Sequence, residues 1–108
     1  MDVAYSVLMV CRANIGRSPM AMGLLQAQVA GEAQDWKIAS AGTWADEGEP
    51  AAPSTLRLLL EKGIDLSSHR SKVVTRQMLT EFNLVLVMEQ GQKEALRTSS
   101  AALLLLLA

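Results

Sequence analysis

Short apolar runs alternate along the chain with longer segments whose apolar residues recur at helical spacing. Residues 3–10 and 84–88 are nearly continuous apolar runs, typical of strands buried on both faces of a parallel sheet, and residues 36–41 indicate another strand. Residues 19–31 indicate a helix that ends near Gly31, and residues 53–62 place leucines along one stripe and end before Gly63, as helices do. Strands that alternate with helices predict an α/β fold with a parallel sheet flanked by helices.

The second half of the chain adds weaker elements. Thr75 is a predicted N-cap for a short helix that carries Phe82, and a helical stretch is expected near residues 92–97. Residues 101–108 read AALLLLLA and leave open a fourth buried strand, a slipped helix or a stretch of uncertain sequence. We therefore expect a flavodoxin-like layout with strand order 2-1-3, with strand 4 as an option. Ligands of such sheets bind beyond the carboxyl ends of the strands, where the loop after the first strand lies.

Length and composition fit a single domain over residues 1–108. Half of the residues are hydrophobic and 19% are charged, which is a globular composition. The net charge of −1 does not favour nucleic acid, so an anionic ligand would need local positive potential. Residues 1–6 lack the features of a secretion signal, and the apolar run at 101–108 is far shorter than the roughly 20 residues that cross a bilayer. The single cysteine fits a reducing compartment, so we expect a cytoplasmic protein without a membrane partner.

The loop at residues 11–19 combines the residue types that hold a tetrahedral oxyanion. Arg17 follows Cys11 at the start of the predicted helix and offers a planar fork for two phosphate oxygens. The helix N-terminus adds its own donors, and the positive field favours the thiolate of Cys11 as a nucleophile. Ser18 can donate a hydrogen bond to that sulfur. Successive backbone N–H groups can form an anion nest, and the residues that supply them are Arg12, Ala13, Asn14, Ile15 and Gly16.

Simpler interpretations of this loop remain open at this point. A lone cysteine at a strand end is often a buried structural residue, and a cysteine and an arginine at this spacing are weak evidence on their own. Asn14 and Gly16 do tolerate the left-handed backbone angles of a tight cradle. No Gly-Lys-Ser/Thr follows the first strand, and one histidine with one cysteine cannot assemble the usual metal cluster. We expect no metal and no cofactor.

The complete segment at residues 7–21, VLMVCRANIGRSPMA, resembles the signature of the low-molecular-weight protein tyrosine phosphatase family almost position by position. The resemblance extends over about residues 3–97 and includes, in family order, SAGT at 40–43, GID at 63–65, SHRS at 68–71 and LVLVME at 84–89. It implies a two-step reaction in which Cys11 attacks phosphorus and water then hydrolyses the cysteinyl-phosphate. Arg17 and the loop amides would stabilise the equatorial oxygens.

The resemblance also implies roles for two aromatic side chains outside the loop. His69 would hydrogen-bond into the loop and support Asn14, although a surface histidine is the simpler alternative. Trp44 would form one wall of the substrate cleft and stack on phosphotyrosine, whereas Trp36 is expected in the core. The implied ligands are a phosphotyrosine protein or a small aryl phosphate, with phosphate or sulfate-like anions in the loop.

The sequence departs from the family pattern at two points. Many members carry a second cysteine where this chain has Gly16, so Cys11 cannot form their protective disulfide. The family's general acid lies in an Asp-Pro-aromatic loop before a final helix, and no Asp-Pro occurs here. We therefore expect a domain without that acid loop and helix, with impaired catalysis and an uncovered sheet face that invites self-association. A solvated acidic loop, or less simply a substitute acid, accounts for Asp46, Glu47 and Glu49.

The leading hypothesis is metal-free hydrolysis of phosphotyrosine and other aryl phosphates through Cys11. Arsenate reduction with an external thiol is one alternative, because the two further cysteines of a thioredoxin-coupled relay are absent. A catalytically impaired module that binds phosphate or phosphotyrosine is another.

Overall fold

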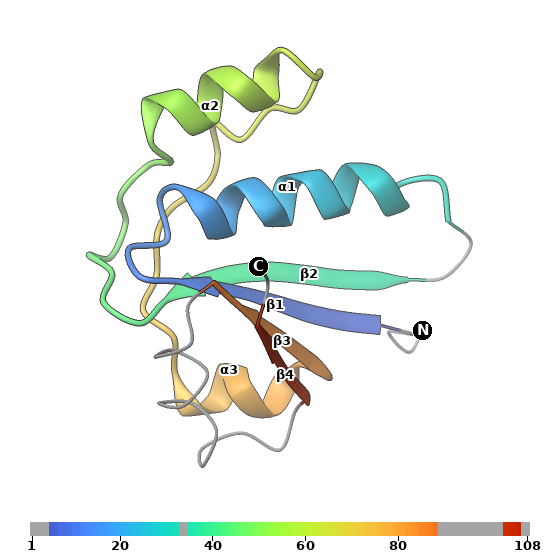
Figure 1. The fold of residues 1–108 in the computed structure, drawn as a ribbon, viewed down its shortest axis with the longest axis vertical. Helices are drawn as coiled ribbons and strands as arrows, with labels where there is room; N and C mark the ends of the chain where they lie inside the picture. Colours follow the sequence, from blue (N-terminus) through green and yellow to red (C-terminus); the bar gives the residue numbers. More distant parts are fainter. Residues whose placement is uncertain (1–4, 33–34, 89–102, 107–108) are drawn as a thin grey trace.

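Four parallel strands form the centre of the protein, which we describe from a computed structural model at residues 5–32, 35–88 and 103–106. The strands lie in the order β2-β1-β3-β4 (Figure 1). Their bounds are β1 Tyr5–Cys11, β2 Trp36–Gly42, β3 Leu84–Val87 and β4 Leu103–Leu106. The expected order 2-1-3 is confirmed, and within the tail residues 103–106 form the fourth strand beside β3.

Helices cover both faces of this sheet. Helix α1, Arg17–Val29, packs on β1 and β2, and α2, Pro53–Leu60, lies outside α1 on the same side (Figure 1). Helix α3, Arg76–Glu81, covers the opposite face. None of these helices in the described part of the chain is long and apolar enough to cross a membrane. The helical stretch expected near residues 92–97 lies outside the described residues.

Element boundaries follow local backbone chemistry closely. Helix α2 ends at Leu60 rather than Lys62, because the amides of Lys62 and Gly63 bond to carbonyls only three residues back and tighten the last turn. Gly63 then adopts a φ of 77°, a left-handed conformation that favours glycine. At α3, the Thr75 side chain accepts a hydrogen bond from the Met78 amide, so the expected N-cap is confirmed.

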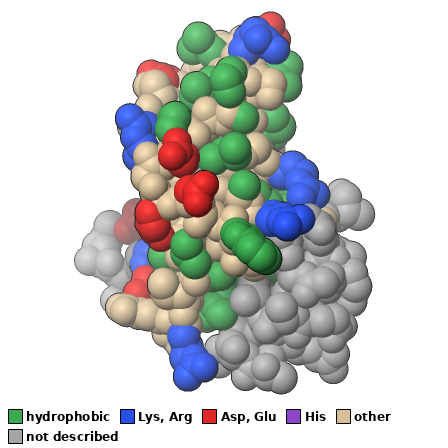
Figure 2. Space-filling model, turned by 90° about the vertical axis from the view of Figure 1, so that its left-hand side faces the viewer, with side chains coloured by type: hydrophobic (Ala, Val, Ile, Leu, Met, Phe, Trp, Pro, Cys, Tyr) green, Lys and Arg blue, Asp and Glu red, His purple; other side chains and the backbone are tan. Residues whose placement is uncertain are grey.

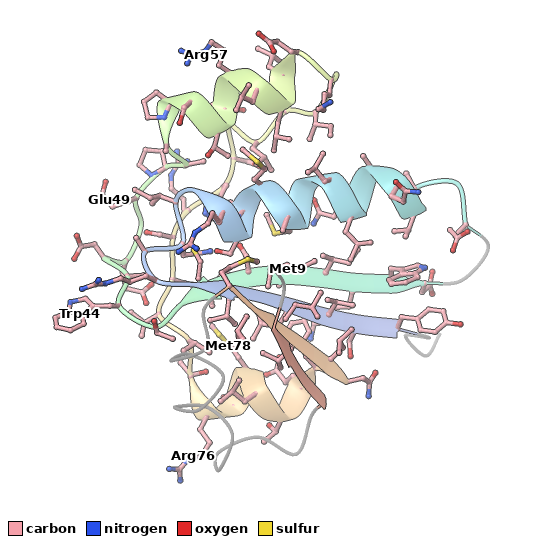
Figure 3. The ribbon with its side chains drawn as sticks, in the orientation of Figure 1. Met9, Trp44, Glu49, Arg57, Arg76 and Met78 are labelled. Carbon is pink, nitrogen blue, oxygen red and sulfur yellow. The ribbon has the colours of Figure 1, made fainter. Side chains whose placement is uncertain are left out.

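The main core lies between the sheet and α3. It consists of buried side chains from β1, β2, β3 and α3, with Met78 packed against them (Figure 3), and its members are Leu8, Val10, Ala41, Leu79, Phe82, Val85 and Val87. On the α1 side, Gly23 allows close packing on α2, because a Cβ there would lie 3.1 Å from Leu59 Cδ1. Trp36 was expected in the core, but it is not part of the buried cluster. It is half-buried and stacks on Tyr5 with ring centroids 4.6 Å apart.

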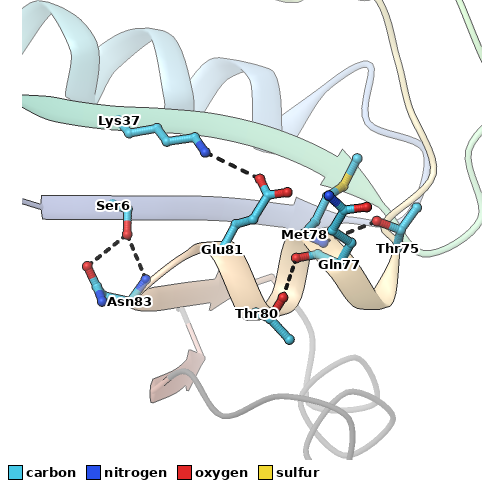
Figure 4. A network of polar contacts seen from close by, with 8 residues as sticks. All are labelled: Ser6, Lys37, Thr75, Gln77, Met78, Thr80, Glu81 and Asn83. Atoms are coloured by element: carbon cyan, nitrogen blue, oxygen red, sulfur yellow. Dashed lines mark hydrogen bonds and ion pairs between the residues drawn. The ribbon is translucent and has the colours of Figure 1, made fainter. Parts of the chain in front are cut away.

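Polar contacts tie α3 to the strands beside it (Figure 4). The Ser6 hydroxyl on β1 donates to Asn83 Oδ1 at 2.8 Å and accepts the Asn83 amide at 2.8 Å. Lys37 on β2 reaches Glu81 at 3.3 Å. These contacts connect the end of α3 and the residue pair after it to the first residues of β1 and β2.

Candidate active site

The loop between β1 and α1 is held from two sides by neighbouring backbone. On one side, the amides of Thr43 and Trp44 donate to the carbonyls of Cys11 and Arg12 at 3.0 and 2.8 Å. On the other, the Ala52 amide donates to the Ile15 carbonyl at 2.7 Å. All three residues lie in the connection between β2 and α2, so this one segment holds the β1–α1 loop near both of its ends (Figure 1).

The sulfur of Cys11 lies inside this loop and has polar neighbours. Cys11 is 3% exposed, and the backbone N–H of Asn14 donates to its Sγ at 3.3 Å. The Ser18 hydroxyl, on the first turn of α1, is 2.9 Å from the same sulfur. An amide three residues further along the chain can reach the sulfur only if the backbone curls back over it. The sulfur therefore sits at the base of a curved loop that begins at a strand end and finishes at a helix N-terminus.

Asn14 links the loop to the surrounding structure. It is fully buried and has a φ of 59°, a left-handed conformation that asparagine tolerates better than most residues. Its side-chain amide donates to the hydroxyls of Ser18 at 2.8 Å and Ser40 at 2.9 Å. Its side-chain oxygen accepts the Lys72 amide at 3.0 Å. The side chain thus connects α1, β2 and the segment before α3.

His69 approaches the same residue from its other side. His69 Nε2 lies 2.8 Å from the main-chain carbonyl oxygen of Asn14, and the imidazole is buried. Because a carbonyl oxygen only accepts, this contact requires a proton on Nε2. The contact holds the main chain of the loop at its left-handed residue, Asn14.

Two arginines and one tryptophan lie at the rim of the loop. Arg17 is the first residue of α1 and is exposed, as is Arg12. The Arg12 guanidinium carbon lies 5.5 Å from the centre of the Trp44 ring, a cation–π contact that orients both side chains. Trp44 is 77% exposed, and it projects from this end of the molecule (Figure 3). An exposed aromatic ring therefore lies beside the β1–α1 loop.

The acidic loop after Trp44 is fixed by residues that precede α3. The Glu47 carboxylate accepts the Val73 amide at 2.8 Å, so it is already engaged. Ser71 accepts the Glu49 amide at 2.9 Å and donates from its hydroxyl to the Asp46 carbonyl. The carboxylates of Asp46 and Glu49 are exposed, and acidic side chains gather beside apolar ones on this end (Figure 2).

Sequence reasoning missed several residues that build this site. Ser40, Ser71 and Lys72 make the contacts above, yet no property of these residue types singled them out. Gly42 also approaches the loop so closely that a Cβ would lie 2.5 Å from the Arg12 carbonyl oxygen. The available signal was their place inside or next to the SAGT and SHRS segments, which resembled the family without an assigned role.

The chain is similar in sequence to known phosphatases. The family described as low molecular weight phosphotyrosine protein phosphatase matches residues 6–105. The chain is 37% identical over 97 residues to a probable low molecular weight protein-tyrosine-phosphatase, EpsP, of Ralstonia nicotianae, covering 90% of this chain and 64% of that protein. It is also 37% identical over 90 residues to a protein-arginine-phosphatase of Geobacillus stearothermophilus, covering 83% of this chain and 58% of that protein.

A solved structure of a longer chain has a similar fold. It is Wzb of Vibrio vulnificus in complex with benzylphosphonate, with a TM-score of 0.82, 29% identity, and coverage of 94% of this chain and 72% of the other. The chain spans less than two thirds of the length of the two curated relatives, 64% and 58%.

Proposed function

The chain belongs to the low-molecular-weight phosphotyrosine protein phosphatase family, and on this premise we propose that it hydrolyses phosphotyrosine and other aryl phosphate monoesters through Cys11. One observation carries the proposal. The Cys11 sulfur lies at the base of the β1–α1 loop, 3.3 Å from the Asn14 amide nitrogen and 2.9 Å from the Ser18 hydroxyl. A nucleophile in this position faces any tetrahedral anion that the loop amides bind.

In the first step, the Cys11 thiolate attacks phosphorus in line, and the bond between phosphorus and the aryl oxygen breaks. The aryl oxygen leaves with the electron pair and takes up a proton. In the second step, water attacks the cysteinyl-phosphate, and phosphate leaves while the thiolate is restored. Arg17 and the loop amides stabilise the charge on the equatorial oxygens in both steps. The Ser18 hydroxyl donates to the sulfur and stabilises it as a leaving group in the second step.

Asn14 and His69 position these groups rather than react. The Asn14 side chain donates to the Ser18 hydroxyl at 2.8 Å, which leaves that hydroxyl's own proton available to the sulfur. His69 holds the Asn14 carbonyl at 2.8 Å and keeps the loop curled. Together these two contacts hold the loop in its curled form around the Cys11 sulfur.

Trp44 favours an aryl substrate. Its ring is largely exposed, and the backbone N–H of Trp44 is fixed to the Arg12 carbonyl at 2.8 Å. The ring can therefore stack on a phenyl group whose phosphate lies in the loop. Arg12 and Arg17 add positive charge at the rim, which suits a dianionic phosphate. The relative in complex with benzylphosphonate, an aryl phosphate analogue, supports this substrate class.

Protonation of the leaving group is the weakest part of this site. No Asp-Pro occurs in the 108 residues, and the Glu47 carboxylate is held by the Val73 amide. A missing general acid typically costs about 10²–10⁴ in rate. We therefore expect the 108-residue chain to hydrolyse para-nitrophenyl phosphate, whose leaving group needs little protonation, and to hydrolyse phenyl phosphate at least about 100-fold more slowly.

The first prediction tests the nucleophile directly. Cys11→Ser is expected to abolish release of nitrophenol from para-nitrophenyl phosphate, whereas Ser18→Ala should lower kcat about 10- to 100-fold and trap a cysteinyl-phosphate that mass spectrometry detects. Lys62→Met, an exposed site after α2, is the matched control and should be unchanged. Equal rates for wild type and Cys11→Ser would refute the proposal.

The competing activities have their own readouts in the same assay. Phosphoarginine is included because one relative is a protein-arginine-phosphatase, and faster release of phosphate from it than from phosphotyrosine would overturn the aryl preference. Arsenate-dependent consumption of an external thiol, without hydrolysis of aryl phosphate, would indicate a reductase instead. Saturable binding of phosphotyrosine with no turnover of either aryl ester would indicate a binding module.

A further inference from the structure

A pocket of about 170 Å³ lies on the opposite face of the sheet from α1, between β2 and α3. We call it the α3 pocket. Its apolar lining includes Leu8, Met78 and Phe82, and its polar lining includes Lys37, Lys72 and Glu81. Of these side chains, none has a part in the reaction proposed for Cys11. The α3 pocket is thus separate from the anion-binding loop, although the two share neighbours.

The charges around the α3 pocket do not cancel. The Lys37 ammonium pairs with the Glu81 carboxylate at 3.3 Å and lies 4.8 Å from the centre of the Phe82 ring (Figure 4 shows the ion pair). Lys72 is half-buried, and within the described residues its ammonium has no hydrogen bond or ion pair. The charged side chains of the described lining, Lys37, Lys72 and Glu81, therefore leave one net positive charge beside an apolar wall, a combination that attracts an anion with an apolar body.

We propose that the α3 pocket binds a small monocarboxylate with a short aliphatic or aromatic body. The carboxylate would pair with the Lys72 ammonium, and the body would lie against Met78 and Phe82. The volume of about 170 Å³ is below the roughly 300–1,000 Å³ of drug-sized sites, which excludes a nucleotide or a phosphotyrosine peptide. A single ammonium without a nest of amides also suits a planar carboxylate better than a tetrahedral phosphate.

The α3 pocket is mechanically connected to the phosphate loop through Asn14. The Lys72 amide donates to Asn14 Oδ1 at 3.0 Å, while Ser40, which also lines the pocket, accepts from Asn14 Nδ2 at 2.9 Å. Two residues that line the α3 pocket therefore hydrogen-bond to the Asn14 side chain. A ligand that displaces Lys72 changes the environment of Asn14, and through it that of Ser18 and the Cys11 sulfur.

The test is a titration of the whole ¹⁵N-labelled chain with hexanoate, followed by nuclear magnetic resonance, with and without saturating inorganic phosphate. Hexanoate should cause saturable shifts at Met78 and Phe82 and at the side-chain amide of Asn14, and phosphate should not abolish them. Lys72→Met should weaken hexanoate binding about fivefold or more, because it removes the unpaired charge. Lys62→Met, an exposed lysine far along the chain from α3, should leave it unchanged.

Two further variants test the α3 pocket in other ways. One is expected to strengthen hexanoate binding, and the other changes the shape of the pocket without changing its charge. Glu81→Gln removes the partner of Lys37 and should tighten hexanoate binding at least about twofold. Ala39→Val narrows the pocket and should abolish binding even with both lysines present. If Lys72→Met does not fold, these two variants still test whether hexanoate binds in the α3 pocket.

Several outcomes would overturn the inference. They are loss of hexanoate binding when phosphate is added, equal affinity in Lys72→Met and Lys62→Met, or an Asn14 side-chain signal that does not move. A failure of the proposed function is distinguishable, because phosphate would then cause no shifts in the loop while the hexanoate titration still reports on the α3 pocket.

Discussion

Asn14 is the residue on which the geometry of the site depends most. It combines a left-handed backbone with a side chain that makes hydrogen bonds to Ser18, Ser40 and Lys72. Aspartate would present an acceptor where Nδ2 donates, and alanine would leave buried polar partners unsatisfied. The residue type is therefore set by the hydrogen bonds as much as by the backbone angle.

A second prediction separates these two contributions. Asn14→Ala is expected to lower the free energy of unfolding by about 2–4 kcal/mol, because it loses buried hydrogen bonds and strains the turn. Asn14→Gly loses the same hydrogen bonds but accepts a φ of 59° freely, so its urea midpoint should be higher than that of Asn14→Ala. If alanine is as stable as glycine at this position, backbone strain has no part in the choice of residue.

Cys11 carries the third prediction, also at the residue scale. It is the single cysteine of the chain, so mild peroxide should convert it to sulfinic and sulfonic acids that dithiothreitol does not reduce. Mass spectrometry should show added oxygen atoms and lasting loss of activity.

The matched variant is Gly16→Cys, where a Cβ has no neighbour within 4 Å. By resemblance to family members with a cysteine there, it should form a disulfide with Cys11 and recover activity on reduction. If the wild-type chain, oxidised by peroxide without added thiol, regained full activity on reduction with dithiothreitol, this prediction would be contradicted.

At the scale of elements, the site is assembled where the carboxyl ends of β1 and β2 meet the segment before α3. Gly42, the last residue of β2, accepts the Val74 amide at 2.8 Å and donates to the Lys72 carbonyl at 2.9 Å. The loop after β1 passes directly beside it, at the Arg12 carbonyl. Three segments thus meet at one position with no space for a side chain.

The fourth prediction concerns this junction. Gly42→Ala places a Cβ 2.5 Å from the Arg12 carbonyl oxygen, so the loop must move, and we expect a loss of about 1–3 kcal/mol in stability. The KM for para-nitrophenyl phosphate should rise with it. Gly31→Ala is the control, because no atom lies within 4 Å of its Cβ position, and its effect should stay within about 0.5 kcal/mol. Equal urea midpoints for the two variants would show that the Arg12 carbonyl can move away from a Cβ at position 42 without loss of stability.

At the scale of the whole molecule, the parallel sheet places strand ends, loop amides and a helix N-terminus at one end (Figure 1). If the loop binds an anion as proposed, the anion binds the folded chain and not the unfolded one, so its binding energy adds to the stability of the fold. Self-association through an uncovered sheet face stays a prediction.

The fifth prediction follows from this linkage. Inorganic phosphate or sulfate should raise the Tm, and at 100 times its Kd should stabilise the folded chain by about 2.7 kcal/mol. Chloride at equal ionic strength should not. Arg17→Met should remove most of the phosphate effect, because the guanidinium supplies a bidentate contact. Differential scanning calorimetry measures the Tm with each salt. Equal increases in Tm with phosphate and with chloride would exclude a specific anion site.

The sequence by itself determined the elements and the chemical core of the site. Apolar runs and helical spacing predicted the bounds of β1, β2, β3, α1 and α2 to within about two residues, because these patterns reflect local burial. The same patterns left the nature of residues 101–108 open. Cys11, Asn14, Arg17 and Ser18 belong to one continuous segment from the end of β1 to the first turn of α1, so the chain itself keeps them close together. The resemblance to a family then gave His69 and Trp44 expected roles.

Only the tertiary structure decided what surrounds that loop. Ser40 and Lys72 reach Asn14 across 26 and 58 residues of sequence, and the α3 pocket combines β1, β2 and α3. Trp36 was expected in the core but is half-buried. The burial of a strand residue depends on which strand lies beside it, and this also is decided by the tertiary structure. Contacts across such separations depend on the order in which strands pair and on how helices pack over them. Periodicity along the chain records which face of an element is buried, but not which distant residue buries it.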